Sequence, residues 1–139
     1  MANYYGFAKT NYFRVTDEDR YAKLFSHLVV SDGDMLDDFS KEENGVVFHG
    51  FGAYSSIDFK VSSPESQYLE YDFDAFIEML QEILPDGEAF IYTEVGHEKL
   101  CYLTGYSIVA TKDEVRSISL NDESLNAARE MLKNPEFEY

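Results

Sequence analysis

The sequence predicts an α+β fold in which a mostly antiparallel, five- to six-stranded sheet carries three amphipathic helices packed on it. The chain has 139 residues, 45% of them hydrophobic, with 11 Phe and 11 Tyr, which is enough apolar mass for one core. Strand-like segments separated by short turns favour antiparallel pairing, and three segments have helical apolar spacing. We expect a single globular domain over residues 1–139, with a short tail from about residue 134.

The N-terminal third predicts a strand followed by a helix. Residues 4–15 are rich in aromatic and β-branched side chains, which favours a strand. Thr16 fits an N-cap, because the three acidic residues that follow it would lie where the helix dipole favours anions. An apolar stripe at i, i+3, i+4 and i+7 then predicts about three helical turns, with Tyr21, Leu24, Phe25 and Leu28 facing inward.

The middle of the chain predicts an acidic connection and two strands. Residues 31–45 are polar and acidic, and we interpret them as a loop or a short helical turn. Residues 46–54 and 57–61 are strand candidates. Gly50 and Gly52 interrupt the first of these strands, which indicates a bulge or a close approach of another backbone.

The C-terminal half predicts two more helices around three strands. Asp72 is the expected N-cap of the second helix and Pro85 ends it; the inward residues are Phe73, Phe76, Ile77, Leu80, Ile83 and Leu84. Residues 88–95 and 100–111 predict a hairpin that turns at residues 96–99, and residues 115–120 predict a further strand. Asn121 or Asp122 would cap the last helix, which Pro135 stops; its inward residues would be Leu125, Ala128 and Leu132.

Charge and cysteine content exclude several classes of protein. The chain carries 27 Asp plus Glu against 11 Lys plus Arg, a formal charge of −16, which argues against direct binding to nucleic acid or to an anionic membrane. The longest apolar runs are shorter than a bilayer span, and the N-terminus lacks a charged-then-apolar signal. A lone cysteine, Cys101, excludes an intrachain disulfide framework and fits a reducing compartment, so we expect a cytoplasmic protein.

Catalytic and metal motifs are weak in this sequence. Cys101 lies four residues after His97, but a cysteine in an apolar strand commonly behaves as a small hydrophobe. The acidic segment that begins at Asp32 fails the EF-hand pattern, because Leu36 and Asp37 stand where an oxygen ligand and a glycine are needed. Zinc-ligand spacing and a phosphate-binding glycine loop are missing as well. We therefore expect no catalytic residue, no metal and no cofactor.

The distribution of acidic residues is the strongest functional signal. Between Val61 and Glu98 there are ten acidic residues and no Lys or Arg. Three of them are spaced i, i+4, i+8 on the second helix, opposite its apolar stripe, so they form a solvent-facing ridge with charges about 6 Å apart. That density resembles a nucleic-acid backbone, whose phosphates advance roughly 3.4 Å along the axis. The candidate partner-binding residues form two sets: Asp74, Glu78, Glu82, Asp86 and Glu88, and then Asp32, Asp34, Asp37 and Asp38.

Several short segments carry a resemblance to a known group of proteins. Residues 1–6 (Met-Ala-Asn-Tyr-Tyr-Gly) and 10–15 (Thr-Asn-Tyr-Phe-Arg-Val) are similar to the opening of small acidic accessory proteins of Gram-positive conjugative and other mobile elements. Residues 50–54 and 85–92 resemble that group too. The resemblance implies a bacterial host cytoplasm and a context that includes anti-CRISPR and anti-restriction inhibitors, several of which mimic DNA.

These observations favour a non-enzymatic inhibitor that binds a basic nucleic-acid-handling protein of bacterial defence, a Cas effector or a restriction enzyme, by DNA mimicry. One alternative is a small enzyme that uses His49, His97 or Cys101 in a tyrosine-lined pocket. Another is an accessory or immunity-type protein with a different basic partner. The charge alone also fits a protein that is acidic only for solubility.

Overall fold

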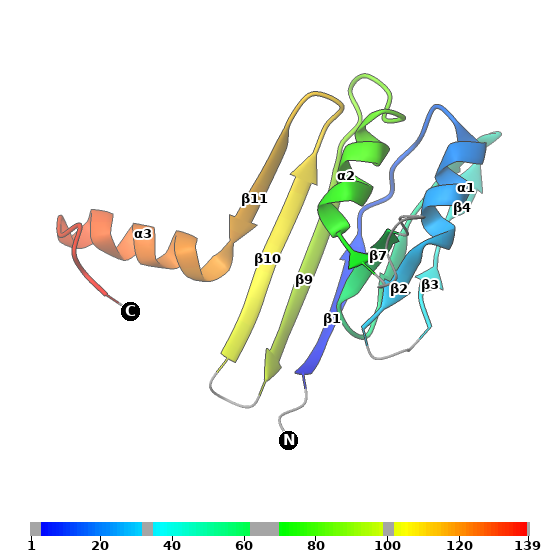
Figure 1. Cartoon of the computed structure of the whole chain (residues 1–139). Coiled ribbons are helices and arrows are strands. Elements are labelled where there is room, and N and C mark those ends of the chain that lie inside the picture. Colours follow the sequence, from blue (N-terminus) through cyan, green and yellow to red (C-terminus); the bar gives the residue numbers. More distant parts are fainter. Residues whose placement is uncertain (1–3, 32–34, 62–69, 99–101, 139) are drawn as a thin grey trace.

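A computed structural model of the chain describes residues 4–31, 35–61, 70–98 and 102–138, without the side chains of residues 4 and 102. Within these residues the chain forms three helices and eleven strands, which confirms the predicted α+β class. The main sheet has six strands in the order β11-β10-β9-β1-β6-β3, and every pairing in it is antiparallel (Figure 1). Its strands are β1 (Tyr4–Thr10), β3 (Asp37–Asp38), β6 (Phe51–Ala53), β9 (Phe90–Glu98), β10 (Tyr102–Ala110) and β11 (Val115–Ser119).

Two smaller sheets lie beside the main one. The first contains β2 (Leu28–Val30), β7 (Ile57–Val61) and β8 (Glu70–Tyr71), and the second is the hairpin of β4 (Lys41–Glu43) and β5 (Val46–Phe48). The acidic stretch 31–45 was wrongly predicted as loop or helical turn, because its described part contains β3 and β4. Leu28 is also in a strand rather than at the end of a helix.

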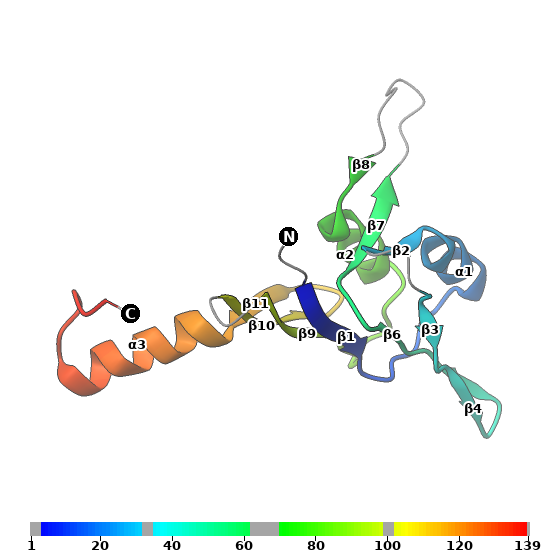
Figure 2. The same cartoon turned by 90° about the horizontal axis from the view of Figure 1, so that it is seen from below.

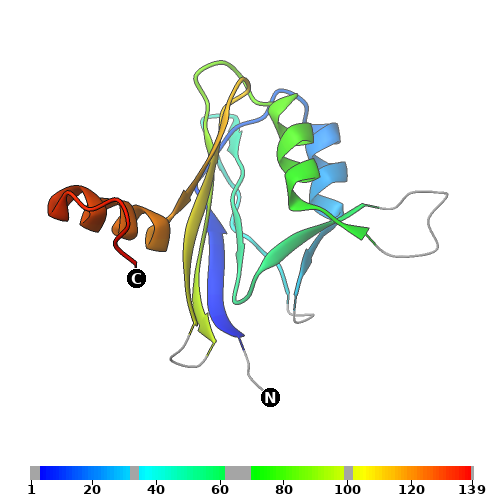
Figure 3. The same cartoon turned by 60° about the vertical axis from the view of Figure 1, so that its left-hand side comes forward.

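Helices α1 (Glu18–Ser26) and α2 (Phe73–Gln81) lie on one side of the main sheet (Figure 3). Asp72 caps α2 as predicted, since its side chain accepts a hydrogen bond from the Ala75 backbone N–H. The predicted cap of α1 was wrong by one residue. Asp17 accepts from the Arg20 N–H, whereas the hydroxyl and backbone N–H of Thr16 both donate to the Ile83 carbonyl just after α2.

The core is built from aromatic rings that connect α2 to the sheet. Phe13, Phe51, Phe76 and Phe90 are fully buried, and the ring centroids of Phe13 and Phe90 are 5.0 Å apart. The predicted inward stripe of α2 is confirmed, with Phe73 partly buried and the other five residues, up to Leu84, buried.

Close approach of another backbone, which the sequence indicated at Gly50 and Gly52, is confirmed at Gly52, where an added Cβ would lie 2.8 Å from the carbonyl oxygen of Ala8. At Gly50 the close neighbour is a side chain, since an added Cβ would lie 2.3 Å from Cε2 of Phe39. The predicted strand 46–54 is divided into β5 and β6, with Gly50 between them. The first strand is shorter than predicted as well, because β1 ends at Thr10 and only Phe13 bridges to His49 beyond it.

Helix α3 (Leu120–Leu132) differs most from the prediction. Ser119 caps it by accepting from the Asp122 N–H, so neither Asn121 nor Asp122 is the cap. The helix extends beyond the β11 edge of the sheet, away from α1 and α2 (Figures 1 and 2). None of its residues is buried in the described structure. Of the residues expected to point inward, Leu125 and Ala128 are half-buried and Leu132 is exposed, so the prediction was wrong for Leu132 and holds only in part for the other two. In the described part of the chain, one face of the main sheet consequently has no helix lying across it (Figure 3).

Candidate functional site

Helix α2 presents two acidic side chains of the first predicted surface to solvent. Asp74 and Glu78 are exposed, one helical turn apart, on the side opposite the buried stripe. No basic side chain of the described residues forms an ion pair with either of them. These two carboxylates are available to an external cation.

The other three members of that surface are already paired with bases from distant parts of the chain. The ion-pair distances are 2.6 Å from Glu82 Oε2 to Arg20 Nη2, 2.5 Å from Asp86 Oδ1 to Lys112 Nζ and 2.9 Å from Glu88 Oε2 to Arg14 Nε. The Lys112 ammonium donates a hydrogen bond that lowers the pKa of Asp86 below its usual value. Sequence reasoning missed these pairs because it looked for bases only between residues 61 and 98.

The second predicted acidic surface is described only in part. Asp37 and Asp38 form β3 at the edge of the main sheet, and both are exposed. Asp38 Oδ1 accepts hydrogen bonds from the backbone N–H and the hydroxyl of Ser40, at 2.9 and 2.5 Å. Asp32 and Asp34 lie outside the described residues.

His49 is the histidine with the most elaborate surroundings. It is 8% exposed, its Nε2 lies 2.6 Å from Glu18 Oε2, and its ring stacks on Tyr21 at 4.1 Å. Ser40 Oγ lies 3.5 Å from His49 Nδ1, so the three side chains have the order of a Ser–His–Glu triad. However, the Ser40 hydroxyl donates its proton to Asp38 instead, and a nucleophilic serine must give that proton to the histidine. We therefore interpret the cluster of Glu18, His49 and Ser40 as a structural contact that connects α1 to the sheet.

His97, the second histidine of the enzyme alternative, lies far from His49 in the sheet. His97 is in β9, beside Tyr5 at the start of β1, whereas His49 bridges to Phe13 beyond the other end of β1. The two histidines are thus separated by about eight strand residues, or roughly 26 Å. Cys101 lies outside the described residues.

Glu94, one of the ten acidic residues in the base-free run, faces the core instead of solvent. It is 5% exposed, and its Oε1 accepts from the hydroxyls of Tyr92 at 2.8 Å and Tyr106 at 3.2 Å, while Oε2 accepts from Ser56 at 2.9 Å. Burial and the neighbouring carboxylate raise the pKa of Tyr92. The alternation of side chains along the strand could have predicted that Glu94 points inward, because Glu94 has the same parity as the buried Phe90 and Tyr92.

The uncovered face of the main sheet is a second candidate surface, which sequence reasoning missed. We call it the outer face, and define it by the residues on β1, β9, β10 and β11 that the strand register places opposite the helical side. Phe7 is 55% exposed and Val95 41% exposed at its centre. Among these described positions none is acidic: Tyr5, Phe7, Lys9, Ile91, Thr93, Val95, His97, Leu103, Gly105, Ser107, Val109, Arg116 and Ile118.

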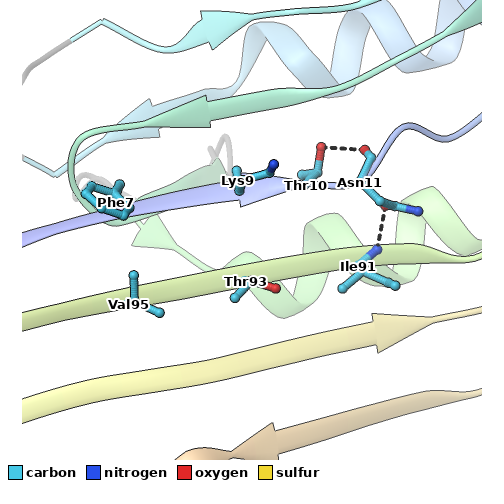
Figure 4. Close-up of a pocket in the computed structure, with 7 residues that line it drawn as sticks. All are labelled: Phe7, Lys9, Thr10, Asn11, Ile91, Thr93 and Val95. Carbon is cyan, nitrogen blue, oxygen red and sulfur yellow. Dashed lines mark hydrogen bonds between the residues drawn. The ribbon is translucent and has the colours of Figure 1, made fainter.

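Three adjoining hollows form a groove across the strands of the outer face. The central hollow, of about 410 Å³, lies between β1 and β9 and is lined by Phe7, Lys9, Ile91, Thr93 and Val95 together with Thr10 and Asn11 (Figure 4). It shares Phe7 and Lys9 with a hollow of about 360 Å³ over β6, and Thr93 and Val95 with one of about 270 Å³ that reaches Leu120. We refer to these three adjoining hollows together as the outer groove.

Comparisons with protein-family models, with curated proteins and with solved structures find no match to this chain. Among the described residues, no three His, Cys, Asp or Glu side chains are grouped so that they could hold a metal ion. The described helices also include none with the length and apolar character needed to cross a bilayer. The geometry of the described residues offers two candidate surfaces, the acidic side of α2 and the outer groove.

Proposed function

We propose that this protein is a non-enzymatic, acidic inhibitor that binds a basic nucleic-acid-handling protein of bacterial defence in the cytoplasm of the host. The observation that carries the proposal is the pair of exposed carboxylates Asp74 and Glu78, which have no ion-pair partner among the described residues. A Lys/Arg channel built for phosphates would bind such a row, and the field of a −16 protein would accelerate the encounter.

Two of the three paired carboxylates, Glu82 and Asp86, extend this surface. The pairs with Arg20 and Lys112 are exposed, and water and salt screen such pairs, so they contribute little to the stability of the fold. A partner that offers several guanidinium or ammonium groups can therefore compete for Glu82 and Asp86. Glu88 is 17% exposed and also accepts the Arg14 backbone N–H, so we expect it to stay bound within the chain.

The experiment is capture from the lysate of a Gram-positive host at about 0.05 M and about 0.5 M salt, followed by a DNA-cleavage assay of the captured protein. We expect a DNA- or RNA-binding nuclease that is retained only at low salt and is inhibited when bound. Recovery of a basic protein that handles no nucleic acid would instead favour the accessory or immunity-type alternative, and no capture at either salt would contradict the proposal.

A matched pair of variants tests the residues. Asp74→Asn with Glu78→Gln removes two charges from α2, and Glu42→Gln with Glu136→Gln removes two exposed charges elsewhere. At about 0.2–1 kcal/mol per rim charge, the α2 variant should bind the nuclease between twofold and about thirtyfold less tightly, with a smaller salt dependence. Equal losses in both variants would mean that net charge alone, and not this helix, determines binding.

A further inference from the structure

Among the described residues, two apolar surfaces have little cover from the rest of the chain, and they are the outer groove and the part of helix α3 beyond its first turn. The first turn itself contacts the sheet through Leu120 and Asn121. An isolated helix of 13 residues is marginal in water, yet α3 is capped at both ends, by Ser119 and by a left-handed Lys133. Its two sides differ in character. The polar side carries Asp122, Glu123, Asn126, Arg129 and Glu130. The mostly apolar side carries Leu120, Leu125, Ala128, Met131 and Leu132 together with Asn121 and Ser124.

The apolar side of α3 is open to solvent. Met131 is 83% exposed, Leu120 is 63% exposed and Leu132 is 58% exposed. We propose that the protein forms a two-fold symmetric dimer in which α3 of each copy lies in the outer groove of the other copy.

The connection between β11 and α3 prevents the helix from filling the groove of its own chain. β11 ends at Ser119 and α3 begins at Leu120, so no residue remains to reverse the direction of the chain. Leu120 is also held against Gly105, where an added Cβ would lie 3.3 Å from Leu120 Cβ. The helix leaves the sheet on the side opposite α1 and α2, which is the side of the outer face (Figure 3).

The lengths of the helix and the groove match. Thirteen helical residues span about 20 Å. The groove crosses the five strands from β6 to β11, and four strand spacings are about 19 Å. Half of the helix surface is roughly 300 Å², the groove would bury a similar area, and two reciprocal contacts reach about 1,200 Å², which is the lower bound for a specific interface.

Charge also favours this face for a second copy. Two chains of formal charge −16 repel each other over most of their surfaces. The outer face carries Lys9 and Arg116 and no carboxylate on β1, β9, β10 or β11, while Asp37 of β3 lines the hollow over β6 and Glu123 lines the hollow at the other end of the groove. Lys9 forms no ion pair with any described residue. The part of the face from β1 to β11 therefore presents two bases and no strand carboxylate to an incoming α3.

The first test measures the assembly of the full chain by sedimentation velocity. We expect a dimer of twice the 16.0 kDa chain mass at micromolar concentration. Leu132→Glu on the apolar side of α3 should raise the dissociation constant at least about thirtyfold, because it buries an unpaired charge. Asn126→Glu adds the same charge on the polar side and should change the constant by less than about threefold. A wild-type monomer, or equal effects of the two variants, would overturn the proposal.

The second test asks where the helix lies. Val95→Glu in the outer groove should weaken the dimer as much as Leu132→Glu, whereas Val46→Glu, at a similarly exposed strand position outside the groove, should not. A photoreactive phenylalanine at Met131, mixed with nitrogen-15-labelled wild type, should cross-link to labelled peptides from β1 or β9. Three results would contradict this arrangement, in which each α3 binds the groove of the other copy. They are a dissociation constant that Val95→Glu leaves unchanged, cross-links to peptides other than those of β1 and β9, and assembly into open chains of higher mass. These tests use no partner protein, so their outcome is independent of the proposed inhibitor function.

Discussion

Tyr21 and Tyr92 are both buried tyrosines, and they differ in what their hydroxyl groups contact. The Tyr92 hydroxyl donates to Glu94 at 2.8 Å and accepts from the Ile57 backbone N–H at 3.3 Å. The Tyr21 hydroxyl has no hydrogen-bond partner among the described residues, and burial raises its pKa. A buried polar group without a partner costs about 1–3 kcal/mol, so one ring stabilises the fold through its hydroxyl and the other does not.

Phenylalanine substitution at the two positions should therefore have opposite effects. Tyr21→Phe removes an unsatisfied hydroxyl and should leave the free energy of unfolding unchanged or raise it by about 1 kcal/mol. Tyr92→Phe leaves Glu94 and Ile57 without one partner each and should lower it by about 1–3 kcal/mol. Urea unfolding followed by circular dichroism measures both, and a Tyr21→Phe loss as large as that of Tyr92→Phe would contradict the assignment.

The Asp86–Lys112 pair gives a prediction about acid titration. The Lys112 ammonium lowers the pKa of Asp86 in the folded chain, so the pair stabilises the fold above the unfolded value of about 3.9 and loses that effect as the pH falls through the lower, folded value. Lys112→Met should move the Asp86 pKa back toward its ordinary value, as measured by carboxyl chemical shifts across a pH titration. Arg116→Met, which removes a nearby base paired with Glu114, is the control and should not move it.

At the scale of elements, the apolar pattern predicted that α2 and α3 are amphipathic helices but not what covers each apolar side. The two helices look alike in sequence, since each has leucines at helical spacing after a polar cap. Of these two helices, only α2 packs against the core. The chain returns through β7 before α2, and Phe76 of α2 then contacts the rings of Phe51 and Phe90. Apolar spacing in a sequence predicts that one side of a helix is covered, but it does not show whether the surface that covers it belongs to the same chain or to another chain.

The buried side of α2 should respond to cavity formation while its exposed side should not. Leu80 is fully buried, so Leu80→Ala should lower the free energy of unfolding by about 2–5 kcal/mol. Met79, its neighbour on the same helix, is 39% exposed, and Met79→Ala should cost less than about 1 kcal/mol. Thermal or urea unfolding of the two variants measures these changes. A loss in the free energy of unfolding below about 0.5 kcal/mol for Leu80→Ala would mean that the helix does not support the core.

Across the whole molecule, the sequence predicted the antiparallel sheet and the solvent-exposed acids of α2, but not the two-sided distribution of charge. The strand alternation that gives β9 its buried parity also sets Thr93 and Val95 outward. Only the register with β1 and β10 brings the outward residues of these three strands into one face, on which none of them is a carboxylate. The three ion pairs at Glu82, Asp86 and Glu88 were equally hidden, since each joins residues more than 20 positions apart. A search along the sequence cannot find ion pairs between residues that only the fold brings together.

The two surfaces should respond to salt in opposite directions, which separates them in one experiment. Binding of the acidic α2 side to a basic partner depends on attraction between exposed charges, so raising the salt from about 0.05 to about 0.5 M should weaken it. Self-association through the outer groove buries apolar side chains between two chains of formal charge −16, so the same salt screens the repulsion and should tighten the dimer severalfold. Sedimentation velocity across the salt series measures the dimer, and a titration with the captured nuclease measures the other interaction. If salt weakened the dimer as well, ion pairs at Lys9 and Arg116 would outweigh apolar burial in the groove, and Lys9→Met should then abolish that dependence.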